Sequence, residues 1–228
     1  MRQVLALGGG GFSMEPENPL LDQYILKQSA KKKPKICFIG TASGDAEGYI
    51  EQFYNFFNKE NCEPSHLSLF NPHTRDINKF IQEQDILYVG GGNTKNLMAL
   101  WREWELDVAI RQAYDKGTIL AGLSAGSLCW FDQGVTDSYG SGLEPISCLG
   151  ILRGSHCPHY DGEENRRPAY QAFIQNGSLG SGFAADDGVA LHFIDGELQH
   201  IVSSRPEAYG YRVDKDKETQ LSTRYLGS

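Results

Sequence analysis

The chain has 228 residues, and its 21 Lys and Arg against 29 Asp and Glu give a formal net charge of −8. This acidic balance argues against a protein whose main partner is a nucleic-acid backbone. A content of 40% hydrophobic and 22% charged residues argues against intrinsic disorder. Glycine is over-represented: 26 of the 228 residues are glycine, whereas glycine makes up about 7% of an average protein. Such an excess indicates backbone positions that need a positive φ or close packing.

The five cysteines form no Cys-x-x-Cys pair, and their number is odd: Cys37, Cys62, Cys129, Cys148 and Cys157. This usage predicts a reduced, cytoplasmic protein rather than a disulfide framework. The apolar run in residues 1–7 is too short for a signal-peptide core, and no segment approaches the length of a membrane span. We therefore expect no membrane and no nucleic acid among the partners.

In the first half of the chain, short apolar runs alternate with helical patterns, which is typical of a parallel sheet with crossover helices. The expected strands are 3–7, 35–39, 66–70, 85–89 and 118–121. The expected helices are 20–30, 46–59, 77–84, a segment through Leu97 to Trp101, and 106–115. The aromatic stripe within 46–59 has the spacing of a core face.

After about residue 130 the pattern changes. Residues 132–160 are rich in Gly, Ser and Pro and predict loops and short strands, and 165–175 predicts a helix. Strands are expected at 188–194 and 197–203, because the intervening Asp195-Gly196 is a strong hairpin signal. No linker stands out, so we expect one domain over residues 1–228, of the α/β class, with a mainly parallel sheet and an antiparallel C-terminal hairpin.

The segment Gly122-Leu123-Ser124-Ala125-Gly126 lies between a predicted strand and a predicted helix. That context predicts a nucleophile elbow, in which a strained turn exposes the serine hydroxyl. The Ala125 amide at the helix start could then face a developing oxyanion. The alternative is an ordinary glycine-rich turn in which Ser124 only caps the helix.

A serine nucleophile needs a base, and the base needs an orienting acid. Of six histidines, His156 and His159 follow a strand-like run, where a loop can place side chains over a crevice. With Cys157 and Asp161 they also resemble metal ligands, but Pro158 opposes a shared helical face, so we expect no metal and no cofactor. Composition leaves the acid open among Asp132, Asp137, Glu144, Asp186 and Asp187.

The run Gly8-Gly9-Gly10-Gly11 follows the first strand and suggests a nucleotide-binding loop. It lacks the complete dinucleotide fingerprint and the P-loop lysine, and the next predicted helix starts late. We therefore expect a βα turn, with a nucleotide-binding protein as an alternative.

Four motifs together resemble the aspartyl dipeptidase (peptidase E) family of serine peptidases, which includes the cyanophycinases as relatives. They are Val89-Gly90-Gly91-Gly92-Asn93-Thr94, the Gly122–Gly126 segment, Thr136-Asp137, and Cys157-Pro158-His159-Tyr160. The resemblance covers most of the chain and is strongest over 85–167. It implies a three-layer α/β/α fold like that of class I glutamine amidotransferases.

The resemblance also implies roles. Ser124 matches the nucleophile, and His159 matches the base because the family histidine lies in an x-Pro-His-aromatic sequence. Gly92 and Ala125 match the oxyanion amides, and Asp137 matches the acid. The segment between Ser124 and Asp137 is shorter than usual, so Glu144, and after it Asp186 or Asp187, remain alternatives for the acid.

For the substrate, the resemblance implies a small peptide, in the family a dipeptide with N-terminal aspartate. Asn93 and Arg166 are the expected binding residues, although Arg166 could equally be a solvated arginine at a helix start. The expected protein is a cytoplasmic serine dipeptidase, with a homodimer as an open possibility. The competing interpretation is a non-catalytic or nucleotide-binding α/β protein that keeps the fold.

Overall fold

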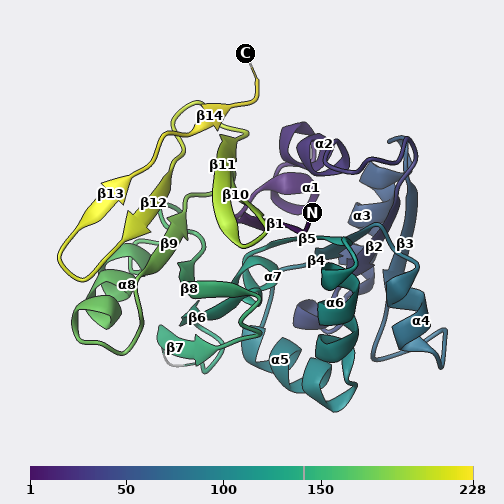
Figure 1. The fold of residues 1–228 in the computed structure, drawn as a ribbon, viewed down its shortest axis with the longest axis horizontal. Coiled ribbons are helices and arrows are strands. Elements are labelled where there is room, and N and C mark those ends of the chain that lie inside the picture. The colour runs from purple at the N-terminus through teal and green to yellow at the C-terminus, as the bar shows by residue number, and fades with distance from the viewer. Residues whose placement is uncertain (141, 228) are drawn as a thin grey trace.

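The structure is a computed structural model that describes residues 1–140 and 142–227. Its central sheet has eight strands (Figure 1), in the spatial order β14 (Arg224–Tyr225), β11 (Glu197–Ser203), β10 (Val189–Ile194), β1 (Gln3–Leu7), β5 (Ile119–Leu123), β4 (Ile86–Val89), β2 (Lys35–Ile39) and β3 (Glu63–Leu67). The five strands from β1 to β3 are parallel, and β10 joins β1 in antiparallel register. The carboxyl ends of β1, β4 and β5 therefore meet at one edge, where open α/β sheets place their sites.

Helices cover both faces of this sheet, because successive strand residues point to opposite sides. Leu5 and Leu7 of β1 join the apolar cluster beneath one helical layer, while Val4 and Ala6 join the cluster of the other. The first layer consists of α1 (Gly11–Met14), α2 (Leu20–Leu26) and α3 (Glu47–Phe57). The second contains α4 (Ile77–Gln82), α5 (Thr94–Glu103) and α6 (Leu106–Asp115). This is the three-layer α/β/α arrangement that the sequence predicts.

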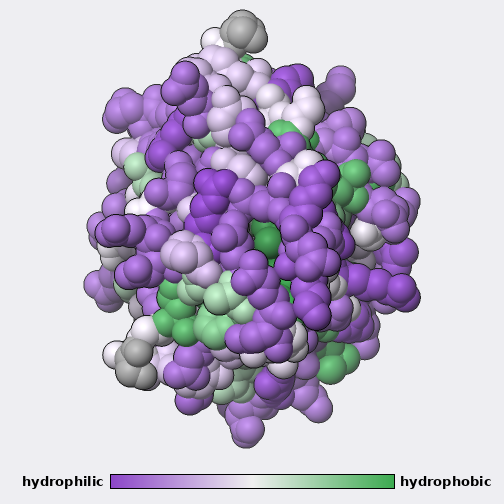
Figure 2. Space-filling model, turned by 90° about the vertical axis from the view of Figure 1, so that its left-hand side faces the viewer, coloured by the Kyte–Doolittle hydropathy of each residue, from purple (hydrophilic) through white to green (hydrophobic). Residues whose placement is uncertain are grey.

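A second sheet of six strands lies beside the first (Figure 1), in the order β13 (Glu218–Gln220), β12 (Gly210–Val213), β9 (Gly182–Ala185), β8 (Leu152–Cys157), β6 (Phe131–Thr136) and β7 (Glu144–Ser147). Helix α8 (Arg166–Gln175) packs on it through a separate core that includes Tyr160, Tyr170 and Tyr211. The surface on this side of the molecule is largely hydrophilic, with small apolar areas (Figure 2). Two short elements complete the chain, the 3-10 turn η1 (Thr41–Ser43) and helix α7 (Ala125–Leu128).

The strand pattern of the first half is confirmed, with one displaced element. Residues 66–70 were expected as the third strand, but β3 begins at Glu63 and contains Pro64. Proline lacks the amide that an inner strand needs, yet β3 lies at the sheet edge, where proline is tolerated. The expected hairpin is confirmed as β10 and β11, with Asp195 and Gly196 both at positive φ (49° and 90°).

Among the described residues, no helix is both long and apolar enough to cross a membrane. The five cysteines carry free thiols, four of them buried.

Candidate active site

Ser124 occupies a strained turn between β5 and α7. Its φ of 56° and ψ of −119° are strongly disfavoured for a residue with a side chain. Within residues 118–131, Ser124 is partly exposed and all the remaining residues are buried. This is the backbone of a nucleophile elbow, which turns the serine side chain out of the sheet edge.

The two glycines that flank this turn leave room for close backbone contacts. A Cβ on Gly122 would lie 2.3 Å from the Gly126 carbonyl oxygen, and one on Gly126 would lie 2.1 Å from the Val89 carbonyl oxygen. Any larger residue would push α7 away from β4. The Gly-x-Ser-x-Gly spacing is therefore required by packing as well as by the turn.

The loop after β4 passes beside Ser124. A Cβ on Gly91 would lie 3.2 Å from the Ser124 Cβ, and Gly92 has a φ of 137° with its Cα packed against the Ala42 carbonyl. Across residues 1–140 and 142–227, neither the Gly92 amide nor the Ala125 amide donates a hydrogen bond to another residue. Backbone amides near a serine that have no other partner are candidates for stabilising an oxyanion.

His159 lies just after β8 and is held by a carboxylate. Its Nδ1 is 2.6 Å from Asp187 Oδ1, and both side chains are nearly buried, at 13% and 12% exposed. Burial alone would raise the pKa of Asp187, but the hydrogen bond and charge of His159, with Arg205 and Arg166 behind them, lower it. An ionised Asp187 accepts a hydrogen bond from Nδ1–H, which leaves Nε2 as the ring nitrogen without a proton.

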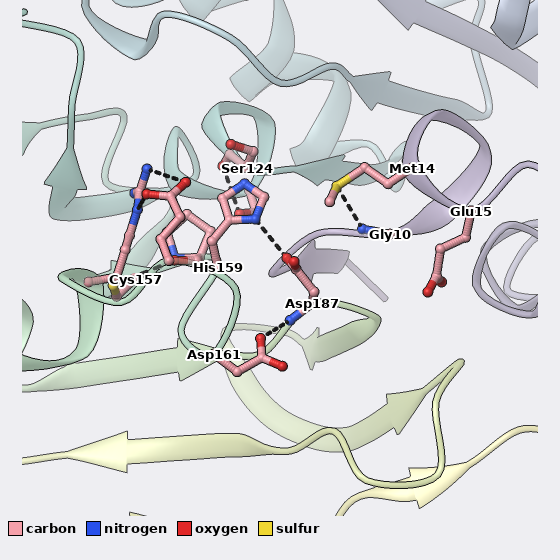
Figure 3. A network of polar contacts seen from close by, with 12 residues as sticks. Gly10, Met14, Glu15, Ser124, Cys157, His159, Asp161 and Asp187 are labelled. Atoms are coloured by element: carbon pink, nitrogen blue, oxygen red, sulfur yellow. Dashed lines mark hydrogen bonds and ion pairs between the residues drawn. The ribbon is translucent and has the colours of Figure 1, made fainter.

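Figure 3 shows Ser124 on the side of the imidazole that faces away from Asp187. In the part of the chain that the structure describes, the Ser124 hydroxyl makes no hydrogen bond with the ring. Contacts between a nucleophile and its base are often long before substrate binds. The order Ser124, His159, Asp187 is that of a nucleophile, a base and an orienting acid.

The acid partner differs from the one expected. Asp137 was predicted beside His159, but its side chain is 65% exposed and lies 3.8 Å from Arg166 instead. Glu144 is exposed on edge strand β7. Asp186 turns its Oδ2 to the Tyr209 amide and the Tyr211 hydroxyl, and burial raises its pKa to about 6. Of the five candidates, Asp187 is the one that reaches the histidine.

The glycine run after β1 brings these residues together. The Ser124 amide donates to the Leu7 carbonyl and the His159 amide to the Gly8 carbonyl, each at 3.2 Å, while the Gly188 amide donates to the Gly9 carbonyl at 3.1 Å. Consecutive residues of one strand end thus anchor the backbones of Ser124 and His159 and the turn that carries Asp187. Within the run, Gly8 packs against the backbone of 185–186, whereas Gly9 packs against the side chain of Asp187 and Gly11 against that of Tyr88, so these residues form a closely packed turn.

Arg166 is buried and surrounded by hydrogen-bond acceptors. Its Nε and Nη2 donate to the two Glu163 carboxylate oxygens at 2.6 and 3.2 Å, and Nη1 donates to the Val135 carbonyl at 3.3 Å. With a side chain only 5% exposed, it is not the solvated arginine considered as an alternative. Asp137 is its most loosely held partner.

The side chain of Asn93 is occupied at both ends. Its Oδ1 accepts from the Asn96 amide at 2.8 Å and caps α5, and its Nδ2 donates to the Ser138 carbonyl at 3.1 Å. The Ser138 hydroxyl also accepts from the Thr94 amide. Asn93 therefore ties the Gly92 loop to the 136–138 segment that carries Asp137.

His156 is fully buried and stacked on Phe131 with ring centroids 4.6 Å apart, and its ring nitrogens face the Ser127 hydroxyl and the Phe183 carbonyl. The two histidines thus do not converge as a metal pair. In the described part of the chain, no group of three or more His, Cys, Asp or Glu side chains is placed to hold a metal ion.

Comparison with known proteins finds similarity to peptidases. The model of peptidase family S51 matches residues 4–201. The uncharacterized peptidase YgaJ of Bacillus subtilis is 55% identical over 231 residues, covering 100% of both chains. A solved peptidase from an acI-B1 actinobacterium has a TM-score of 0.74 at 17% identity, covering 98% of this chain and 95% of its own. A protein provisionally assigned as peptidase E from Listeria monocytogenes has a TM-score of 0.64 at 15% identity, covering 97% and 100%.

Proposed function

This chain belongs to peptidase family S51, and on that premise we propose that it is a serine exopeptidase that cleaves small peptides through Ser124, His159 and Asp187. One observation carries the proposal. Ser124 holds a strained backbone, with φ 56° and ψ −119°, and is partly exposed within an otherwise buried stretch. Such strain persists only where the surrounding structure enforces it, and it marks functional residues.

In the proposed reaction the Ser124 hydroxyl attacks the peptide carbonyl carbon while His159 Nε2 accepts its proton. The Gly92 and Ala125 amides hold the resulting oxyanion, and the loss of one such donor costs about 2.7–4 kcal/mol in comparable hydrolases. His159 then gives the proton to the leaving amine, so that the C–N bond breaks and an acyl-enzyme forms. Water, activated by the same ring, releases the acid product.

Asp187 orients the imidazole and stabilises its charged form during both steps. Support comes from its 2.6 Å contact with Nδ1 and from the lowered pKa that keeps it ionised. The triad is therefore proposed as serine, histidine and aspartate, with the aspartate drawn from the turn after β9.

For the substrate we propose a dipeptide with an N-terminal aspartate, whose side chain replaces Asp137 on Arg166. The contact between Asp137 and Arg166 is long, at 3.8 Å, and the Asp137 side chain is exposed and able to move aside. Its neighbour Ser138 is bonded to Asn93 and Thr94, directly after the proposed oxyanion residue Gly92. In this proposal the buried guanidinium borders the reaction centre, and the substrate carboxylate meets a cation there.

The test is a panel of x-Leu dipeptides in which x is Asp, Asn, Glu or Ala, with release of leucine as the readout and Ser124→Ala as the control. N-acetyl-Asp-Leu tests whether a free N-terminus is needed. We expect Asp-Leu to be cleaved fastest and the Ser124→Ala variant to be inactive. Full activity in Ser124→Ala would reject the nucleophile, and equal rates across the panel would reject the aspartate preference alone.

A fluorophosphonate probe separates the proposal from the competing non-catalytic interpretation. An activated serine reacts covalently with the probe, whereas a serine that only caps a helix does not. We expect labelling of the wild type at Ser124 and none of the Ser124→Ala variant, read by mass spectrometry of the labelled peptide.

A further inference from the structure

Ser127 lies one turn of α7 beyond the nucleophile and is completely buried. Its hydroxyl is 2.8 Å from the Ser124 carbonyl oxygen and 3.1 Å from His156 Nε2. The same Ser124 carbonyl also accepts the Ser127 and Leu128 amides, each at 2.9 Å. Two amide donors and one hydroxyl thus surround the carbonyl of the residue with the strained backbone.

The ring of His156 is held by contacts to both of its nitrogens and to one face. Its Nδ1 lies 3.1 Å from the Phe183 carbonyl, and its plane is stacked on Phe131 at an interplanar angle of 11°. A carbonyl only accepts hydrogen bonds, so Nδ1 carries the proton. Burial, with the nearby charges of His159 and Arg166, lowers the pKa of His156 to about 3 and keeps the ring neutral. Its Nε2 is therefore an acceptor. Because a serine hydroxyl has one proton, the Ser127 hydroxyl shares it between Nε2 and the Ser124 carbonyl in a three-centre hydrogen bond.

We propose that Ser127 and His156 form a positioning bridge, which fixes the turn of the nucleophile against the strand of the general base. Ser127 belongs to α7, which starts directly after Ser124, and His156 belongs to β8, which ends two residues before His159. The shared hydroxyl is the direct side-chain link between these elements. The bridge rests on the proposed function, because it has a catalytic role only if Ser124 and His159 react together.

The bridge acts on the peptide unit between Ser124 and Ala125. The Ser124 carbonyl and the Ala125 amide belong to one rigid plane, so holding the oxygen also aims the amide that is proposed to meet the oxyanion. A tilt of this plane would move the nucleophile, the oxyanion donor and the distance to His159 at once. Errors of about 1 Å in such geometry can cost about a hundredfold in rate.

The test measures the second-order rate of fluorophosphonate labelling of Ser124, together with kcat and KM for the fastest dipeptide of the panel and the melting temperature. Ser127→Ala removes the shared donor, and His156→Leu removes its acceptor. We expect each to lower the labelling rate and kcat by about tenfold or more, with KM within about twofold, since a loss confined to the transition state has this signature. His156→Gln keeps an acceptor near the Nε2 position and should recover part of the rate.

The double variant tests whether the two residues act as one unit. If they do, Ser127→Ala with His156→Leu labels no more slowly than the slower single variant. Independent losses that multiply would overturn the bridge.

Ser155→Ala is the matched control. Ser155 is another fully buried serine, adjacent to His156 on β8, with its hydroxyl bonded to the Tyr170 hydroxyl and the Gly180 carbonyl. We expect this variant to lower the melting temperature without changing the labelling rate per folded molecule. A merely structural Ser127 would behave in the same way, and that result would overturn the bridge.

The two proposals fail differently. Wild type that labels at the same rate as Ser127→Ala contradicts the bridge and leaves the serine peptidase intact. Wild type that neither labels nor hydrolyses any peptide contradicts the proposed function and the bridge with it. If Ser127→Ala does not fold, the comparison of His156→Gln with His156→Leu decides between the outcomes.

Discussion

Gly9 lies directly against the carboxylate of Asp187. A Cβ at position 9 would fall 2.1 Å from Asp187 Oδ1 and 3.0 Å from His159 Nδ1, which are the two atoms of the hydrogen bond between these residues. The Gly9 backbone thus packs directly against the hydrogen bond between Asp187 and His159. The close approach, rather than conformational freedom, is what requires glycine at this position.

Gly9→Ala should therefore separate the acid from the base. The added methyl must displace either Asp187 or the strand end, and we expect kcat/KM to fall by about a hundredfold or more. Gly48→Ala is the control, since Gly48 lies in α3 with no atom within 4 Å of an added Cβ. That change should stabilise the protein by about 0.5–1 kcal/mol and leave kcat unchanged. Dipeptide kinetics and thermal melting of both variants measure the two effects. A Gly9→Ala enzyme of normal activity would show that the close approach of Gly9 to Asp187 is not needed.

Asp187→Asn and Asp137→Asn distinguish the acid seen beside His159 from the one that the sequence favours. An asparagine at 187 cannot stabilise a charged ring and can hold it in the wrong tautomer, so we expect a fall in kcat of about 10³–10⁴-fold. Asp137→Asn should lose far less, because this side chain is exposed and forms an ion pair with Arg166 at the long distance of 3.8 Å rather than with His159. The reverse order of losses would return the role of acid to Asp137.

The sequence predicts the strained turn at Ser124 well because its signal is local. Gly122, Ser124 and Gly126 lie within five residues, and the strand before them and the helix after them are both visible in the apolar pattern. Within the parallel sheet most strands were placed to within a few residues for the same reason. Strand β3 was expected three residues too late, at 66–70. Its Pro64 is tolerated because the strand lies at the sheet edge, and that edge position is a property of the whole sheet rather than of the local sequence.

The acid could not be chosen from the sequence, because its position depends on contacts between distant segments. Asp187 is 28 residues from His159, and it meets the ring only because the turn after β9 crosses the end of β1. The short strands of residues 132–160 were expected, but not that they unite with β9, β12 and β13 in one sheet. A sequence signal for Asp187 did exist, namely an acidic pair between two apolar strands. It was not decisive, because Asp132 and Glu144 also lie near predicted strands.

Tyr49→Phe should loosen the oxyanion loop. The Tyr49 hydroxyl accepts a hydrogen bond from the Gly91 amide at 3.2 Å, one residue before Gly92. Removal of the oxygen leaves that amide unpaired in a largely buried site, at a cost of about 1–3 kcal/mol in stability, and it lets the loop shift relative to Ser124.

We expect Tyr49→Phe to lower both the melting temperature and kcat. Tyr54→Phe is the control, because Tyr54 is on the same helix and its hydroxyl contacts His66, on the far strand β3. Its loss should affect stability alone. Equal kcat losses in the two variants would indicate a general effect of α3 rather than one on the loop.

Asp22 is a buried carboxyl that the proposed mechanism does not use. It is 0% exposed, and among the described residues neither of its oxygens has a hydrogen-bond partner of good geometry. Burial raises the pKa of Asp22 to about 7, only partly offset by the neighbouring Tyr88 hydroxyl and Phe12 amide. The folded protein therefore holds a proton that the unfolded chain, with an aspartate pKa of 3.8, releases.

The sign of the pH effect follows from this difference. Between about pH 4 and pH 7 the folded state binds one more proton than the unfolded state at Asp22, so stability falls as the pH rises through this window and is level above it. A pKa difference of about three units corresponds to about 4 kcal/mol in the free energy of unfolding.

Asp22→Asn removes the titration, so its stability relative to the wild type should increase from pH 4 to pH 7 and then remain constant. Urea unfolding at several pH values measures the difference, with the exposed Asp216→Asn as a control for the lost surface charge. If the two curves stay parallel across this range, Asp22 does not carry the proton that its burial implies.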